Sequence, residues 1–382
     1  MTATPCATAV LKLLRNSVKA LPLYDPGADP EQVARRSTHP LLKLSNNENP
    51  LGVAPAALAA LEQLSARSYS RYPDPACQHL RRALGEHLDS DPERLIIGNG
   101  SENLLELLCL AFLDPADRVV TQSPCFGLHE IFPLMMAAQV VKVASNPDFS
   151  CNLDAWQTAL ATPTKMLLIS NPSNPLGTIF DHQAFTRLID SAPDDTLLVI
   201  DEAYYEFASA DTDFPDALRT LRNQSRPWIV LRTFSKAYGL AGLRVGYGIA
   251  SDASLVQALD RVRTPYNINQ AAQHAALAAL GDPQHVQRSQ AFAAQAREPL
   301  QRALIAAGLR VAPSRTNFLF IDTGVDALEV NRRLLDEAII IKAWREPGYQ
   351  SCIRMSLGQP ADNLRFLEGL QRAVAALRCT SP

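Results

Sequence analysis

Short apolar runs alternate with amphipathic stretches along most of the chain. Between the runs lie stretches with helical spacing, such as Glu102 to Phe112, where Ser101 or Glu102 is expected to supply the N-terminal capping oxygen. Gly, Pro, Asp or Asn bounds each run, which predicts buried strands at 94–98, 118–122, 139–143, 165–170, 196–201 and 228–232. This alternation predicts an α/β fold built on a mostly parallel sheet.

After Gly281 the pattern changes to long Ala- and Gln-rich helical stretches, followed by short apolar runs and a closing helix. The runs predict strands at 317–322, 339–342 and 352–357, and the closing helix is predicted over 361–377. At 382 residues and 47% apolar composition, the chain is long enough for two cores. We expect a large domain over 50–275 and a smaller α+β domain from 1–49 and 276–382.

Charge and cysteine usage exclude several classes of partner. The net charge is -3, and the two signs are interspersed, so neither nucleic acid nor an anionic membrane is expected as a partner. Seven scattered cysteines include no CxxC pair and no histidine at zinc-ligand spacing, which favours reduced thiols in a cytoplasm and no metal site. No segment is apolar enough to span a bilayer, and residues 10–19 predict a short amphipathic helix rather than a signal core.

The segment from Arg232 to Gly246 combines an amine, two hydroxyls and a guanidinium at a Gly-rich turn between two apolar runs. A lysine such as Lys236 can form a Schiff base with the aldehyde of pyridoxal phosphate. Thr233, Ser235 and Arg244 are partners suited to the phosphate of that cofactor. Alone, a Ser-Lys pair is more often a solvated loop, so the interpretation depends on the rest of the chain.

A second group of polar residues stands at the ends of two predicted strands. Asn174 follows one strand within Asn-Pro-Ser-Asn-Pro, and Asp201 and Tyr204 follow another within Asp-Glu-Ala-Tyr. Open α/β sheets bind ligands at these strand ends. Asp201, after an apolar run, could pair with a protonated pyridine nitrogen, while Tyr204 and Asn174 could bond the ring hydroxyl. A helix cap and a simple turn would explain either half alone.

A third element is the glycine turn 98–103, which precedes a helix. Its backbone N–H groups and the helix dipole would receive a phosphate at Ser101 and Glu102. Phe126, after a proline turn, could stack on the cofactor ring, although such an aromatic is more often core.

Together these motifs resemble a fold-type I pyridoxal-phosphate-dependent aminotransferase, and most closely the histidinol-phosphate aminotransferase branch. Further segments extend the resemblance over nearly the whole chain: Pro22-Leu-Tyr24-Asp-Pro-Gly, Lys43-Leu-Ser-Asn-Asn-Glu-Asn49-Pro-Leu-Gly, Tyr72-Pro-Asp-Pro, Pro265-Tyr266-Asn-Ile-Asn and Cys352-Ile-Arg354-Met-Ser-Leu-Gly. Such an ordered set is specific for the fold and the cofactor and less specific for the substrate.

The resemblance implies a role for each matching residue. Lys236 becomes the Schiff-base lysine and the general acid/base, Asp201 the partner of the pyridine nitrogen, and Tyr204 and Asn174 the neighbours of the ring oxygen. The phosphate falls to Ser101, the backbone of Glu102, Thr233, Ser235 and Arg244. Tyr72 matches a tyrosine that reaches the phosphate from a partner subunit, which implies a homodimer. Arg354 would bind the acidic group of the substrate, and Tyr24, Asn49 and Tyr266 would line the substrate pocket.

Two positions depart from the pattern of the branch. Phe126 stands where tyrosine is usual, and it keeps the aromatic face without the hydroxyl. Lys342 stands where a second arginine toward the substrate phosphate is frequent, and lysine keeps the charge without the planar fork. Arg345, three positions on, is a candidate to compensate.

The sequence therefore predicts transfer of an amino group between L-glutamate and imidazole acetol phosphate. Three alternatives stay open: an aminotransferase for aromatic or other amino acids, a pyridoxal-phosphate-dependent decarboxylase of a phosphorylated amino acid, and a non-catalytic binding or regulatory protein. The intact Lys236 and Asp201 argue against the last. Small-molecule amino donors and keto acceptors are the expected partners.

Overall fold

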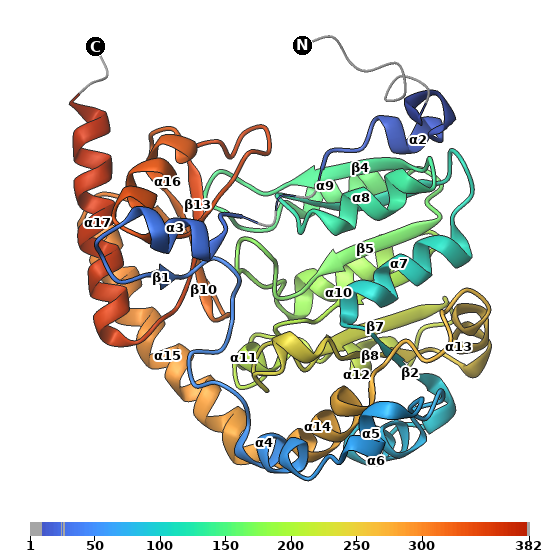
Figure 1. Ribbon diagram of the computed structural model, residues 1–382. Helices are drawn as coiled ribbons and strands as arrows, with labels where there is room; N and C mark the ends of the chain where they lie inside the picture. The colour runs from blue at the N-terminus through green and yellow to red at the C-terminus, as the bar shows by residue number, and fades with distance from the viewer. Residues whose placement is uncertain (1–9, 24, 26, 380–382) are drawn as a thin grey trace.

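A computed structural model gives the fold for residues 10–23, 25 and 27–379 (Figure 1). The strands are β1 Leu42–Lys43, β2 Leu95–Gly98, β3 Arg118–Ser123, β4 Gln139–Ala144, β5 Met166–Ser170, β6 Leu197–Asp201, β7 Trp228–Thr233, β8 Gly246–Ala250, β9 Arg310–Val311, β10 Phe318–Asp322, β11 Ile339–Ile340, β12 Lys342–Ala343 and β13 Cys352–Ser356. The α-helices are α2 Asn16–Lys19, α3 Pro30–Arg36, α4 Pro55–Glu62, α5 Ala66–Ser70, α6 Gln78–Leu88, α7 Ser101–Phe112, α8 Leu128–Met135, α9 Leu153–Leu160, α10 His182–Ser191, α11 Tyr205–Ala208, α12 Ala217–Leu221, α13 Ala253–Asp260, α14 Gln270–Leu280, α15 Pro283–Ala306, α16 Ala327–Asp336 and α17 Pro360–Arg378. Two 3₁₀ turns, Pro92–Arg94 and Ala241–Leu243, complete the described elements.

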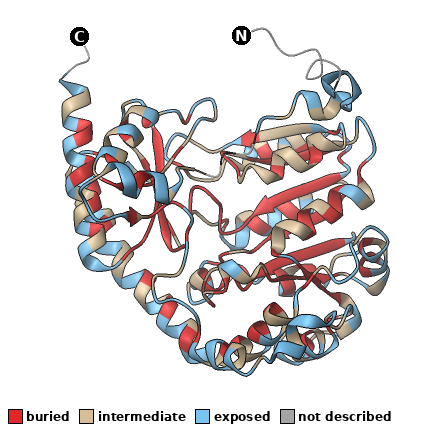
Figure 2. Cartoon of the chain, viewed as in Figure 1, coloured by how far each residue is buried: buried red, intermediate tan, exposed pale blue. Residues whose placement is uncertain are grey.

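The central sheet has the strand order β2-β8-β7-β6-β5-β3-β4. Its strands run parallel except β8, which is antiparallel to both β2 and β7. Successive residues of a strand alternate between two apolar cores, as Leu167 and Ile169 enter one and Met166 and Leu168 the other. Helices cover both faces, and the inner strands β5, β6 and β7 are buried, whereas the edge strand β4 is only partly buried (Figures 1 and 2). Because neither face of the inner strands meets water, β5 and β6 are apolar over most of their length.

The fold confirms the α/β class and the six strands predicted for this sheet. The pattern of apolar positions does not predict β8, because its two glycines and a tyrosine interrupt the apolar run. The cap predicted for α7 was wrong. The N-cap residue is Gly100, with a φ of 78°, and no side chain caps the helix there. Because a positive φ favours glycine, the backbone conformation of this turn requires glycine at the N-cap position.

A four-stranded antiparallel sheet, β12-β13-β10-β9, forms a second layer beside α15, α16 and α17 (Figure 1). The strand predicted at 339–342 is in fact two strands. β11 pairs with β1 in a small parallel ribbon, and β12 joins β13 in the antiparallel sheet. The apolar core of this region takes Leu42 and Leu44 together with residues from Ala293 to Val374. The segment around β1 thus shares one core with the C-terminal part of the chain, whereas α2 packs against α8 beside the central sheet.

The predicted N-terminal helix is interrupted: residues 10–13 are helical, and α2 follows after a break. Among the residues described, no helix is both long enough and apolar enough to cross a membrane. The described cysteines, Cys77, Cys109, Cys125, Cys151, Cys352 and Cys379, are free thiols.

Candidate functional site

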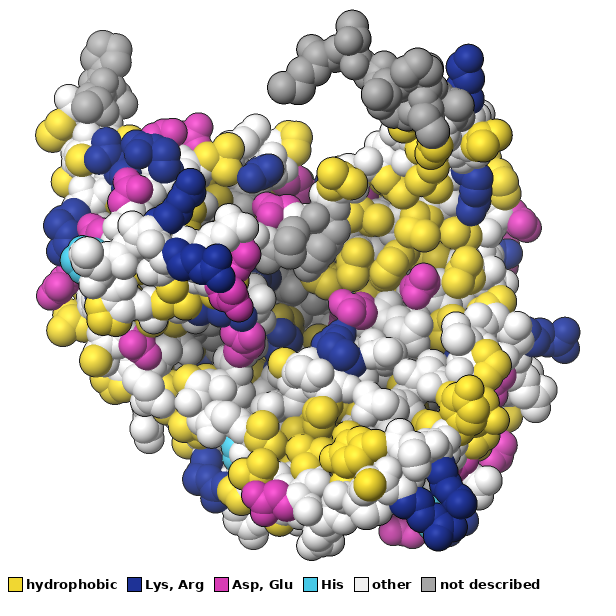
Figure 3. Space-filling model, in the orientation of Figure 1, with side chains coloured by type: hydrophobic (Ala, Val, Ile, Leu, Met, Phe, Trp, Pro, Cys, Tyr) yellow, Lys and Arg dark blue, Asp and Glu magenta, His cyan; other side chains and the backbone are white. Residues whose placement is uncertain are grey.

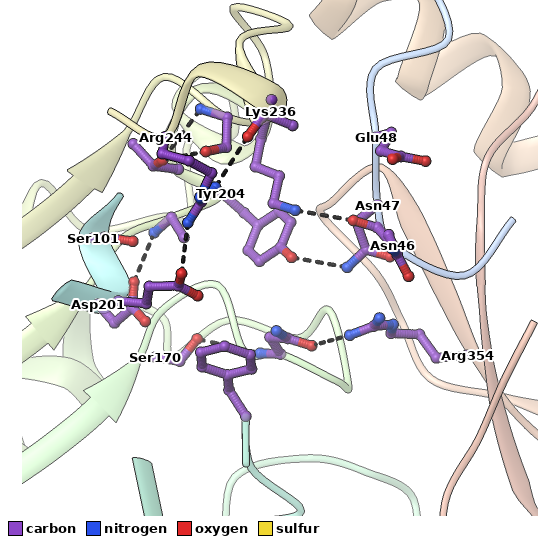
Figure 4. A pocket seen from close by; sticks show the side chains of 18 residues that line it. Asn46, Asn47, Glu48, Ser101, Ser170, Asp201, Tyr204, Lys236, Arg244 and Arg354 are labelled. Atoms are coloured by element: carbon purple, nitrogen blue, oxygen red, sulfur yellow. Dashed lines mark hydrogen bonds and ion pairs between the residues drawn. The ribbon is translucent and has the colours of Figure 1, made fainter. Parts of the chain in front are cut away.

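A cavity of about 400 Å³ opens where the carboxyl ends of β5, β6 and β7 face β13 and the segment 46–48 (Figure 4). We call it the main cavity. Eleven residues singled out from the sequence line it: Ser101, Glu102, Phe126, Asn174, Asp201, Tyr204, Thr233, Ser235, Lys236, Arg244 and Arg354. Asn46, Asn47, Glu48, Ser170, Ala203, Ala241 and Gly242 complete the lining. Segments that are far apart in the sequence therefore meet at the strand ends, as the α/β rule predicts.

One wall of the main cavity is a glycine cradle at the N-terminus of α7. A Cβ atom on Gly100 would lie 2.5 Å from Arg244 Nη2, and one on Gly246 would lie 2.5 Å from the backbone nitrogen of Ser101. Only glycine lets these groups approach so closely. Backbone N–H groups, the helix dipole and a guanidinium thus come together here, which is an arrangement suited to an anion.

Hydroxyl groups and an ion pair complete this wall. Thr233 Oγ1 donates to Ser235 Oγ at 2.9 Å and accepts from Ser235 N at 3.1 Å, so the two hydroxyls are held side by side. Arg244 Nη2 lies 2.7 Å from Glu102 Oε1, and both side chains are partly exposed. The guanidinium is thus held over the cradle, and a phosphate with these groups around it would have charged and neutral donors.

Asp201 lies at the end of β6, with 5% of its surface exposed. Its Oδ1 accepts from Ala203 N at 3.1 Å, and its Oδ2 lies 2.9 Å from Nε2 of His129, which is fully buried on α8. A carboxylate accepts, so Nε2 carries the hydrogen of this bond. His129 was not predicted as a site residue, because a lone histidine on an apolar helix gives no signal of its partner.

Lys236 reaches the centre of the main cavity, between the cradle and Arg354 (Figure 4). Its Nζ donates to the carbonyl of Asn46 at 3.0 Å and lies 5.7 Å from the centre of the Tyr204 ring. Burial, reinforced by the positive charge of Arg354, lowers the pKa of Lys236 to about 8. A substantial fraction of the amine is therefore neutral, and hence nucleophilic, at mildly alkaline pH.

Arg354, on β13, forms the opposite wall. Its Nη1 donates to Asn174 Oδ1 at 2.6 Å, and its Nη2 donates to the carbonyl of Ser45 at 2.7 Å. The backbone nitrogen of Asn174 donates to Ser170 Oγ at 3.2 Å, which anchors the loop after β5. These bonds hold the guanidinium in one orientation at the edge of the main cavity.

A second cavity of about 400 Å³, the side cavity, adjoins the first and shares Phe126 and Arg354 with it. Lys342 lies in it and is the register partner of Arg354 across β12 and β13. Two cations opposite each other favour an anion nearby. Asp25 supplies one, since its Oδ2 lies 3.1 Å from Lys342 Nζ and 3.7 Å from Arg345 Nη2. Burial lowers the pKa of Lys342.

Of the predicted site residues that the structure describes, four lie outside the main cavity: Lys342, which lies in the side cavity, Asn49, Tyr72 and Tyr266. Asn49 instead donates to the carbonyl of Ala237 at 2.9 Å, one residue beyond Lys236. Tyr72 and Tyr266 stack on each other with ring centres 4.5 Å apart, and 80% and 42% of their surfaces are exposed. Tyr24 lies outside the described residues.

Comparison with known proteins agrees with this geometry. Residues 39–370 match the family model described as aminotransferase class I and II. Histidinol-phosphate aminotransferase 1 of Mesorhizobium japonicum is 42% identical over 94% of this chain and 98% of that protein. The chain belongs to the histidinol-phosphate aminotransferase family within the class I and II aminotransferases. Another member, histidinol-phosphate aminotransferase 3 of Rhizobium meliloti, is 40% identical over 95% of this chain and 98% of its own length.

Solved structures of other aminotransferases share the fold. The crystal structure of histidinol-phosphate aminotransferase from Sinorhizobium meliloti in complex with pyridoxal-5'-phosphate has a TM-score of 0.86 and 28% identity, covering 96% of this chain and 98% of that one. Aspartate aminotransferase from Thermus thermophilus with maleate, at 24% identity and a TM-score of 0.79 over 94% of this chain and 99% of that one, shows the fold alone.

Proposed function

We propose that this chain is a pyridoxal-phosphate-dependent transaminase that exchanges an amino group between L-glutamate and imidazole acetol phosphate, with L-histidinol phosphate and 2-oxoglutarate as the other pair. The observation that carries the proposal is the placement of Lys236. Its amine, with a pKa of about 8, lies between an anion cradle and the fixed guanidinium of Arg354.

The residues of the main cavity fit the cofactor group by group. The cradle suits the phosphate, through Ser101, the backbone of Glu102, Thr233, Ser235 and Arg244. Phe126 offers an aromatic face, Asp201 a carboxylate for the pyridine nitrogen, and Tyr204 and Asn174 donors for the ring oxygen. When bound, pyridoxal phosphate supplies an aldehyde that condenses with amines and a ring that withdraws electrons from the adjacent carbon.

Lys236 would act as the general acid/base of the reaction. A neutral Nζ could accept the proton from the substrate carbon that carries the amino group and return it to the carbon on the other side of that nitrogen, which would complete a 1,3-proton shift. Its 3.0 Å bond to the Asn46 carbonyl holds the amine at a fixed place in the main cavity. Asp201 would hold the pyridine nitrogen in its protonated form, and His129 fixes the orientation of that carboxylate.

Arg354 would take the acidic group of the substrate, with Lys342 as the second cation. The bonds to Asn174 and Ser45 pre-orient Arg354, so little side-chain entropy is lost on binding. A doubly charged phosphate gains more from two adjacent cations than a carboxylate does, which favours histidinol phosphate over a plain amino acid. On substrate binding, the ion pair of Lys342 with Asp25 would be replaced by one with the substrate phosphate.

We further propose a homodimer in which Tyr72 of each subunit serves the site of the other. The exposed, stacked Tyr72 and Tyr266 support it, because large exposed aromatics are typical of interface anchors. Apolar side chains, including Leu58 and Leu277, gather over α4 and α14 at the lower edge of the molecule (Figure 3).

The domain limits and the location stay predictions within this proposal. We predict a small domain from 1–49 and 276–382 beside a large one over 50–275, and the core that joins Leu42 and Leu44 to α15 and α17 supports this division for the segment around β1. The preceding segment differs, because Arg15 and Ser17 donate to the carbonyl of Met135 on α8. Limited proteolysis would test these limits, and cell fractionation would test the cytoplasmic location.

The deciding experiment adds L-histidinol phosphate to the purified holoenzyme without any keto acceptor and follows the absorbance of the bound cofactor. Conversion to the aminated form, with release of imidazole acetol phosphate, is the expected result. Conversion by glutamate but not by histidinol phosphate would reject this substrate and favour aromatic or other amino acids. Carbon dioxide release without a keto product would instead indicate the decarboxylase.

A further inference from the structure

The segment Ser45–Asn47 contacts three side chains of the main cavity, each from a different element (Figure 4). The Ser45 carbonyl accepts from Arg354 at 2.7 Å, the Asn46 carbonyl accepts from Lys236 at 3.0 Å, and Asn47 Nδ2 donates to the hydroxyl of Tyr204 at 2.8 Å. The third contact differs from the others, because a hydroxyl both accepts and donates. Whatever donates to it also decides where its own hydrogen can go.

The amide of Asn47 is oriented by its surroundings. Asn47 is 1% exposed, and its backbone nitrogen donates to Ser356 Oγ at 2.7 Å. That hydroxyl has a hydrogen of its own, which it donates to Asn47 Oδ1 at 3.1 Å. The oxygen end of the amide therefore faces Ser356, and the nitrogen end faces Tyr204.

This orientation makes the oxygen of Tyr204 an acceptor toward Asn47. We propose that Asn47 is a positioning residue that sets the hydrogen-bond direction of Tyr204, so that the tyrosine donates its proton into the main cavity, to the ring oxygen of bound pyridoxal phosphate. The inference rests on the proposed function, since that function supplies the ring oxygen.

Asn47 also links Tyr204 to the strand that carries Arg354. Ser356, which orients the amide, lies on β13 two residues after Arg354. The carbonyl of Asn47 accepts from Asn317 Nδ2 at 3.1 Å, which fastens the segment next to β10 as well. A single amide thus connects the wall that would hold the substrate with a hydroxyl that would hold the cofactor.

Replacing Asn47 by aspartate tests the direction of the bond. The backbone at Asn47 has a φ of 55°, which aspartate tolerates nearly as well as asparagine. A carboxylate can only accept, so the Tyr204 hydrogen would turn toward residue 47 and leave the cofactor. A donated hydrogen bond lowers the pKa of the oxygen that receives it, and its loss raises that pKa.

The measurement is a pH titration of the absorbance of the bound cofactor in wild type, Asn47→Asp, Asn47→Gly and Tyr204→Phe. We expect Asn47→Asp to raise the spectral pKa by about one unit, in the direction of Tyr204→Phe. Asn47→Gly keeps the positive φ and removes the amide, so its spectral pKa should lie between those of wild type and Asn47→Asp.

The double variant Asn47→Asp/Tyr204→Phe separates the proposed effect from the charge of the new carboxylate. Without the tyrosine hydroxyl, Asn47→Asp should change the spectral pKa little further. Equal shifts in both backgrounds, or a wild-type spectral pKa in Asn47→Asp and Asn47→Gly, would overturn the inference. If one of these results is obtained while the wild-type protein converts histidinol phosphate, only the inference about Asn47 is overturned, and the proposed function stands. A wild-type protein that binds no pyridoxal phosphate overturns the proposed function as well.

Discussion

At the residue scale, the amine of Lys236 combines partial burial with a nearby guanidinium, and both disfavour its protonated form. We expect Lys236→Ala to lower turnover by at least about 10³-fold, because the variant loses both the covalent attachment point and the base. Pyridoxal phosphate should still bind noncovalently through the cradle. Turnover, and cofactor retained after gel filtration, measure the two effects.

A positive identification complements this variant. Borohydride reduction of the wild-type holoenzyme should leave the cofactor mass on the peptide that contains Lys236 and on no other peptide. Label on a different lysine, or turnover retained by Lys236→Ala, would contradict the assignment.

Two carboxylates near the end of β6, Glu202 and Glu206, are buried, and Glu202 pairs with Arg232 of β7. Arg232 lies 2.8 Å from Glu202 through both Nε and Nη2, and burial raises the pKa values of Glu202 and Glu206 to about 7. Between pH 4.5 and 7 the folded chain therefore keeps protons that the unfolded chain releases. This contribution to stability is present below pH 4.5 and is lost as the pH rises through 7.

We therefore expect the melting temperature of the apoenzyme to fall between pH 5 and pH 8, and to fall less steeply in Glu206→Gln. Calorimetry across that range measures the slope. Glu298→Gln, on the exposed side of α15, is the control for loss of one negative charge. An equal slope in wild type and Glu206→Gln would show that Glu206 does not titrate in this range.

At the scale of elements, the turn between β2 and α7 allows an effect on cofactor affinity to be separated from an effect on stability. Gly100→Ala would strain a φ of 78° and place a methyl group 2.5 Å from Arg244 Nη2. The dissociation constant of pyridoxal phosphate should rise at least about tenfold, as measured by fluorescence titration of the apoenzyme. Gly308→Ala has a similar φ of 77° but open space around it, so it should lose stability without losing cofactor affinity.

How far the sequence predicts each element depends on the length of its pattern. The buried strands of the central sheet were predictable because both of their faces are apolar. β1, β9, β11 and β12 have two residues each, too few to show a period, and β8 is broken by glycines. Which sheet a strand joins depends on contacts between distant residues, so the split at 339–342 was not predictable.

The candidate site shows the same limit. Motifs located the side chains whose chemistry is distinctive, such as Lys236 and Asp201. His129 and Asn47 were missed as site residues because each acts through a partner that only the fold supplies. Asn49, two residues after Asn47, is a predicted site residue, but in the structure its side-chain amide donates to the carbonyl of Ala237.

At the scale of the whole molecule, the proposed homodimer predicts complementation between two damaged chains. Tyr72→Ala should weaken the partner's cofactor site, and Lys236→Ala should disable its own. A hybrid dimer then has one site with both groups intact, so after mixed refolding about one quarter of wild-type turnover should appear at limiting cofactor. Turnover no higher than that of Tyr72→Ala alone would mean that Tyr72 serves its own subunit or no site. Sedimentation should show twice the mass of one chain.

The pairing of β1 with β11 joins residues almost three hundred positions apart. During synthesis, the whole cradle from Gly100 to Arg244 leaves the ribosome before β11 and β13 exist. The central sheet with its cradle can therefore fold first. Leu42 and residues 45–47 can pair with β11 and β13 only after those strands have been synthesised. Arg354 is synthesised after the other residues of the main cavity, so a chain whose translation stops early lacks the arginine that we propose for the substrate.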